Sequence, residues 1–108
     1  MITQSTIIDQ IEITRSGHVQ ARFGLLLLED GKEIACQWHR TAVEPGGDVD
    51  AQIAAVYEHL VQMNRLPCPA TETARVKAIA QLVHTAEVVR KFRDEQARRD
   101  RLEHGPVL

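Results

Sequence analysis

The stretch VQARFGLLLLEDGKEIACQW, residues 19–38, decides the fold, because two alternating segments flank a turn signal. Asp30 followed by Gly31 between two β-type segments is a strong signal for a β-hairpin. The residues that share a face before this turn are Val19, Ala21, Phe23, Leu25 and Leu27. The apolar residues that share a face after it are Ile34, Cys36 and Trp38. We therefore predict an antiparallel pair of strands, about 19–29 and 33–43.

A further strand is expected before this hairpin. Apolar and polar residues alternate over Ile7–Thr14, with Ile7, Ile11 and Ile13 on one face and Asp9 as the misfit on it. Gly17 can supply the positive φ that a tight turn requires. Residues 1–43 are thus predicted to form a three-stranded antiparallel meander, which must pack on another element to be stable.

The second half of the chain has the patterns of helices. Asp48 follows a loop with one proline and two glycines, and is placed to cap a helix over 49–64. The apolar stripe of that helix consists of Val49, Ile53, Val56, Leu60 and Met63. A second, long helix is expected from about Ala70 to beyond Phe92. Thr85 can cap a new start, so a kink near it is left open.

The predicted fold class is α+β, with the meander followed by two helices. The sheet face that bears Phe23, Ile34, Cys36 and Trp38 is expected to meet the stripe of the first helix. Residues 1–92 are predicted to form one domain. Residues 93–108 are expected to be a charged helical extension with a frayed C-terminus, stopped at Gly105 and Pro106.

Composition excludes several classes of protein. The 108 residues carry a net charge of −2, so a general nucleic-acid binder is not indicated. No apolar run is long enough for a membrane span, and residues 1–10 lack the pattern of a secretory signal. Two cysteines cannot form a disulfide scaffold, and a reducing, cytoplasmic setting is expected.

No set of residues indicates catalysis, a cofactor or a metal. Cys36 and His39 have a spacing that could supply two zinc ligands, but a strand would turn them to opposite faces. Cys68 lies between two prolines and looks exposed, yet no base or oxyanion site is evident beside it. The loop at Gly46 and Gly47 lacks the lysine of a phosphate-binding loop. We expect a protein that is not an enzyme and takes no small-molecule substrate.

The interface candidates are Leu26, Leu28 and Tyr57, together with the charged helix. Leu26 and Leu28 make both faces of their strand apolar, so the second face must be covered. The cover is either the chain's own helices, slightly favoured, or another subunit. The basic residues proposed for the helix interface are Arg98, Arg99 and Arg101. Acidic residues are threaded among them, which favours a solvated or partner-docking helix over a nucleic-acid stripe.

Several short motifs resemble those of small proteins of tailed phages and prophages. These motifs lie at Asp30–Ala35, His39–Arg40, Pro45–Asp48, Arg75–Ala80 and Thr85–Val89. Those proteins have unassigned functions and are encoded among virion structural and tail genes. Their motif commonly has a proline after the threonine, where this chain has Ala86. The resemblance covers about Ile7–Phe92 and implies a tail-associated or assembly protein, without a catalytic residue.

We therefore expect a non-catalytic phage structural or tail-associated protein that acts through protein–protein contacts. Its partners would be copies of itself or other phage structural proteins, without a membrane. It would reside in the host cytoplasm during assembly, with the virion as a further location. The alternative is a small regulator or inhibitor that binds a host protein or nucleic acid through the helix over 90–101.

Overall fold

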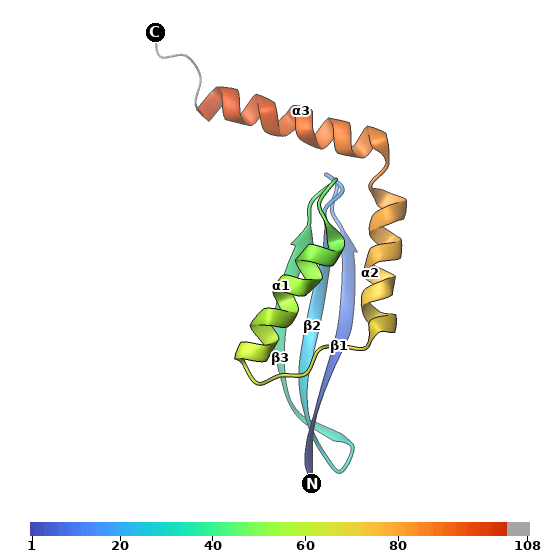
Figure 1. Cartoon of the computed structure of the whole chain (residues 1–108), viewed down its shortest axis with the longest axis vertical. Helices are drawn as coiled ribbons and strands as arrows, with labels where there is room; N and C mark the ends of the chain where they lie inside the picture. The colour runs from blue at the N-terminus through green and yellow to red at the C-terminus, as the bar shows by residue number, and fades with distance from the viewer. Residues whose placement is uncertain (104–108) are drawn as a thin grey trace.

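The computed structural model describes residues 1–103, which form a three-stranded sheet followed by three helices (Figure 1). The elements are, in order, β1 (Ile2–Ile13), β2 (Val19–Glu29), β3 (Lys32–Val43), α1 (Val49–Gln62), α2 (Ala70–Val83) and α3 (Ala86–Glu103). β2 lies between β1 and β3 and pairs antiparallel with both. The predicted α+β class and the antiparallel meander are therefore confirmed.

The β2–β3 connection is the two-residue turn that its sequence predicts. Asp30 has a φ of 50° and Gly31 a φ of 84°. Two consecutive positive φ values define the primed turn that matches the twist of the flanking strands. The N-terminus of α1 also forms as predicted, since the Asp48 carboxylate accepts from the backbone N–H of Ala51 at 3.1 Å.

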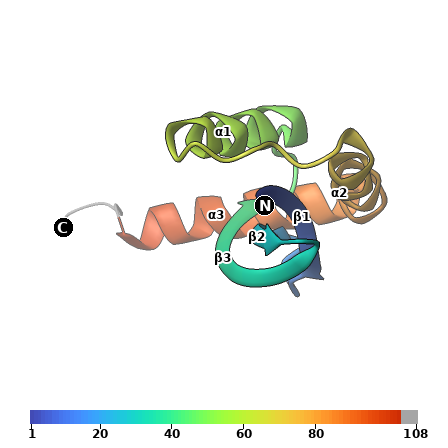
Figure 2. The same ribbon diagram turned by 90° about the horizontal axis from the view of Figure 1, so that it is seen from below.

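The core lies between one face of the sheet and the first two helices. α1 lies alongside β3 and α2 alongside β1, both on the same side of the sheet (Figure 2). Phe23 on the central strand is completely buried. The residues packed in the same cluster include Leu25, Val56, Leu60, Val76 and Ala80. Burying a side chain of the size of Phe23 stabilises the fold by about 1.5–3 kcal/mol.

A β-bulge at Asp9 corrects the predicted alternation of β1. Ile8 pairs with Phe23 and Gln10 with Arg22, so Asp9 is the extra residue. The prediction that Ile7 shares a face with Ile11 and Ile13 was wrong. One additional residue reverses the side on which every earlier residue of the strand lies, which brings Ile8 into the core.

The predicted packing of β3 against α1 was also wrong. Trp38 pairs with Gly24, and Cys36 pairs with Leu26, so both lie on the side of the sheet opposite to Phe23. Trp38 is 48% exposed and Ile34, at a register shift, is 51% exposed. β3 turns its less apolar side chains toward α1, among them His39 and Thr41. Apolar character alone therefore identified the wrong face of this strand.

The long second helix of the prediction is two helices, with the break at His84 and Thr85. The His84 side chain donates from Nε2 to the carbonyl of Gly17 at 2.8 Å. The Thr85 hydroxyl accepts from the backbone N–H of Val88 at 3.3 Å and so caps α3. Thr85, at which the sequence analysis allowed a kink, caps the start of a separate helix.

Only the first turns of α3 touch the rest of the molecule. Phe92 packs edge-on against His18 at a ring distance of 5.1 Å. From Arg93 to Glu103 every side chain is exposed, and the helix projects past the end of the sheet (Figure 1). The predicted helical extension thus extends as far as Glu103, whereas the predicted stop and frayed end at 104–108 lie outside the described residues. Across residues 1–103, no helix is both long and apolar enough to cross a membrane.

Gly17 should be essential for docking α3 on the sheet. A Cβ at Gly17 would lie 2.6 Å from Cγ1 of Val88, and the φ of 94° disfavours any L-residue. We expect Gly17→Ala to lower the free energy of unfolding by about 2–3 kcal/mol. The control is Gly31→Ala, which has a similar φ but no atom within 4 Å of the new Cβ. It should cost about 1–2 kcal/mol in urea unfolding. Equal losses would contradict the docking contact.

Candidate protein-interaction site

The side of the sheet that faces away from α1 and α2 has no cover within residues 1–103 (Figure 2). We call this surface the open face. Its residues, by strand register, are Thr3, Ser5, Ile7, Asp9, Gln10, Glu12, Gln20, Arg22, Gly24, Leu26, Leu28, Glu33, Cys36, Trp38, Arg40 and Ala42. Large apolar side chains gather toward the β2–β3 turn, where Glu33 is the one charged residue, and the other charged side chains lie toward the opposite end.

Trp38 is the central feature of the open face. Its ring reaches across β2, because a Cβ added to Gly24 would lie 3.1 Å from Cζ3 of Trp38. The same Cβ would lie 3.2 Å from Cγ1 of Ile7 on β1, so the two side chains approach one another over Gly24. Half-exposed tryptophans of this kind are typical anchors of protein interfaces.

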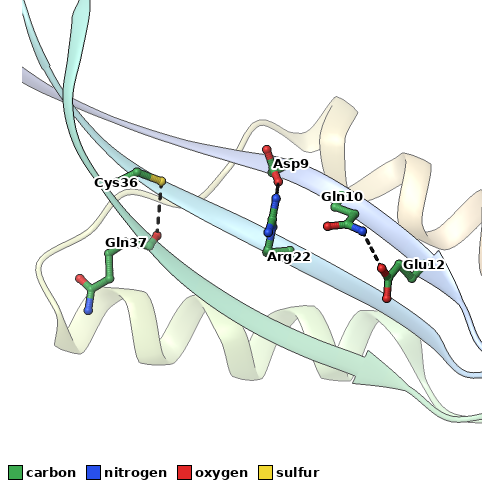
Figure 3. Close-up of polar contacts among 6 residues, drawn as sticks. All are labelled: Asp9, Gln10, Glu12, Arg22, Cys36 and Gln37. Carbon is green, nitrogen blue, oxygen red and sulfur yellow. Dashed lines mark hydrogen bonds and ion pairs between the residues drawn. The ribbon is translucent and has the colours of Figure 1, made fainter.

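An ion pair fixes the middle of the open face. The Arg22 guanidinium donates to the Asp9 carboxylate, from Nε at 2.8 Å and from a terminal nitrogen (Figure 3). The same guanidinium lies 4.1 Å from the ring centre of Trp38, in a cation–π contact. The bulge that displaces Asp9 therefore supplies the carboxylate that holds Arg22 and, through it, the indole.

The charged half of the open face contains a shallow hollow of about 360 Å³. Its polar lining includes Gln10, Glu12, Gln20, Arg22 and Arg40. Gln10 donates from Nε2 to the Glu12 carboxylate at 2.6 Å (Figure 3). Neither Glu12 nor Arg40 forms an ion pair with another residue of 1–103. Both charges remain available to a binding partner.

Leu26 and Leu28 lie where the sheet extends beyond the helices. The segment between α1 and α2 crosses the sheet at Thr6, whose hydroxyl donates to the carbonyl of Leu66 at 2.5 Å. The β2–β3 hairpin and the start of β1 continue past this crossing (Figure 1). Leu26 and Leu28 are half-buried by their neighbours on the open face. The expectation that the chain's own helices cover them was wrong.

Tyr57, the third predicted interface residue, contributes mainly to internal structure. Its hydroxyl donates to the carbonyl of Cys68 at 3.0 Å and lies 3.5 Å from the Cys68 sulfur. Burial raises the pKa of Tyr57 to about 12. The contact joins α1 to the segment before α2, away from the open face.

The cysteines and histidines of residues 1–103 form no group of three that could hold a metal ion. Cys36 and His39 lie on opposite faces of β3, as their spacing predicts. Cys68 is only 4% exposed, so its predicted exposure was wrong. Burial raises the pKa of both Cys36 and Cys68, which opposes thiolate formation. The described residues contain no cluster of three His, Cys, Asp or Glu side chains that could hold a metal ion.

The three arginines predicted on the charged helix are exposed near the end of α3. Arg98 lies 3.0 Å and Arg99 3.8 Å from the Glu95 carboxylate. Part of their positive charge is thus neutralised within the helix. Arg101 forms no ion pair with another residue of 1–103.

Sequence reasoning missed Trp38, Arg22 and Arg40 as members of one surface. The available signal was Asp9, a charged misfit in an otherwise regular apolar alternation. A misfit of this kind indicates a bulge, and a bulge reassigns the faces of the strand.

Comparison with protein-family models, with curated proteins and with solved structures found no match.

The exposures of the two thiols lead to a labelling prediction. In native protein one thiol, Cys36, should react with a maleimide, and Cys68 should react only after denaturation. Mass spectrometry of labelled peptides can count both additions. Cys36→Ser should then leave the native protein unlabelled. Rapid native labelling of Cys68 would contradict its burial and restore it as a candidate nucleophile.

A stacked histidine pair joins β3 to α1 and should make stability depend on pH. The rings of His39 and His59 lie 4.9 Å apart, and His39 also faces Phe23. Burial, and then the nearby His59, lower the pKa of His39 from its ordinary value of about 6.5. As the pH falls, His39 therefore binds a proton at a higher pH in the unfolded chain than in the folded chain. The stability contributed by neutral His39 is complete above about pH 6.5 and is lost as pH falls toward the lower native pKa.

We expect the free energy of unfolding to fall as the pH decreases below about 6.5. His39→Gln should flatten this fall, because glutamine has no proton to gain. Urea unfolding of both proteins at each pH provides the measurement. An identical pH profile for the wild type and His39→Gln would contradict this assignment.

Proposed function

We propose that this chain is a non-catalytic assembly protein that acts through protein–protein contacts made by the open face. The observation that carries the proposal is the exposed Trp38 beside Ile7 and Leu26, on a sheet face that no element described up to Glu103 covers. Large apolar side chains grouped on a surface mark interaction sites in proteins of this size. Burial raises the pKa of both thiols, which opposes thiolate formation and favours binding over thiol-based catalysis.

The setting that we propose is the particle of a tailed phage or prophage, or its assembly in the host cytoplasm. The motifs at Asp30–Ala35 and Pro45–Asp48 support this setting by their resemblance to small phage proteins. A sheet that presents one exposed apolar face is suited to joining copies of a structural protein. The partners would be other virion proteins or further copies of this chain.

The alternative function, a small regulator or inhibitor, is supported by the exposed arginines of α3. α3 projects from the body with Arg98, Arg99 and Arg101 exposed (Figure 1). Binding through these arginines would be strongly weakened by salt if the partner were a nucleic acid. Binding through Trp38 and Leu26 would depend little on salt, because apolar burial is not screened.

Site-specific photocrosslinking should distinguish the two surfaces. A benzophenone amino acid at position 38, introduced in cells that carry the native gene, should form covalent adducts with protein partners. The matched control is position 82 on α2, because Leu82 is 79% exposed but lies outside the open face. Position 98 tests α3. Adducts at 38 with a virion protein are the expected result, whereas adducts confined to 98 would replace this proposal with the regulator.

A further inference from the structure

We propose that the open face pairs with the open face of a second copy, with the two-fold axis running along β2. This inference rests on the proposed function, since it names one partner for the same surface. It follows from how the apolar and charged residues are distributed over the three strands.

The distribution along the strands restricts how two open faces can meet. Leu26, Leu28 and Trp38 lie toward the β2–β3 turn, and Arg22 and Arg40 lie toward the opposite end. If the two copies ran in opposite directions, the leucines would be buried against guanidinium groups, at a desolvation cost. When like ends meet, Leu26 faces Leu26 and Leu28 faces Leu28 across the axis. For two faces that overlap along their full length, the axis therefore runs parallel to the strands.

The distribution across the strands then matches charges between the copies. With the axis along β2, β1 of one copy lies over β3 of the other. Gln10, Arg22 and Arg40 are paired across the three strands, so Gln10 of one copy lies over Arg40 of the second copy. Glu12 is the next residue along β1 on the same face, two positions from Gln10. Glu12 and Arg40 form no ion pair within residues 1–103, and the same holds for Glu33, which lies near the β2–β3 turn. Each dimer would contain this Glu12–Arg40 pair twice.

The residues nearest the axis do not oppose this arrangement. Arg22 would approach its own copy, but its charge is already matched by Asp9 in the same chain. Asp9, Glu12, Arg22 and Arg40 together sum to zero charge, and the remaining charge, Glu33, would lie over Thr3 of the second copy in the row that contains Leu28. Gly24 lies at the centre with no side chain, and Ile7 faces Trp38 of the second copy in the same row. Two sheets that stack face to face in this way lie about 10 Å apart.

The area of the open face is sufficient for a specific dimer. Three strands of 11 or 12 residues, at ~3.3 Å per residue and ~4.8 Å between strands, present a face of about 500 Å². Two such faces bury about 1,000 Å², which reaches the lower limit of specific interfaces. We therefore expect a dimer of modest affinity that dissociates on dilution.

The test is charge reversal across the axis, read by the dimer Kd from light scattering or sedimentation over a dilution series. Arg40→Glu and Glu12→Arg should each raise the dimer Kd roughly tenfold. The double variant should return the Kd to within about threefold of the wild type, because each pair is then restored with its signs exchanged. Arg90→Glu on α3 is the matched control and should leave the Kd unchanged. All of these positions are exposed, and circular dichroism confirms folding.

A chain that stays monomeric at every concentration would overturn self-pairing. A dimer that is insensitive to Arg40→Glu and Glu12→Arg, or not rescued by the double variant, would overturn it as well. None of these results decides the proposed function, because position-38 crosslinking tests separately whether the open face contacts another virion protein. The double variant could restore the dimer while position 38 crosslinks to no other protein. This combination would support self-pairing and would count against a virion partner at the open face.

Discussion

The structure depends on one constraint, namely that a sheet has two faces and the helices of residues 1–103 cover only one of them. β2 is paired on both sides, so its odd-numbered residues from Val19 to Leu25 are buried under α1 and α2. Its even-numbered residues necessarily point the other way. The exposure of Trp38 and the position of Leu26 both follow from that parity. Covering the second face would require another layer, which the helices between Val49 and Glu103 do not supply.

The bulge at Asp9 reconciles β1 with this arrangement. Without it, Ile8 and Ile11 could not both face the helices, because they are separated by an odd number of positions. The extra residue places Asp9 beside Arg22 on the open face, where the ion pair orders the guanidinium under the indole of Trp38. One local irregularity thus completes the core on one side and organises the interaction surface on the other.

Sequence predicted the elements well and their faces less well. The turn at Asp30 and Gly31, the cap at Asp48 and the stripe that contains Val56 depend on local chemistry, which a single sequence displays. The face of β3 depends on its register with β2, and the most apolar face of a strand is the expected buried one. Trp38 violates that rule, and such violations are typical of functional surfaces. The separation of α2 from α3 depends on the Thr85 cap, which the sequence indicated, and on the His84 contact with Gly17, which no short-range pattern encodes.

The chain has a single tryptophan, so its fluorescence reports directly on the open face. The most direct measurement is acrylamide quenching of Trp38 over a dilution series. Efficient quenching in the most dilute samples, declining as the protein concentration rises, is the result expected if Trp38 lies on an open face that pairs with a second copy. Protection from acrylamide at every concentration, with the blue-shifted emission of a buried indole, would place Trp38 in the core and contradict the account.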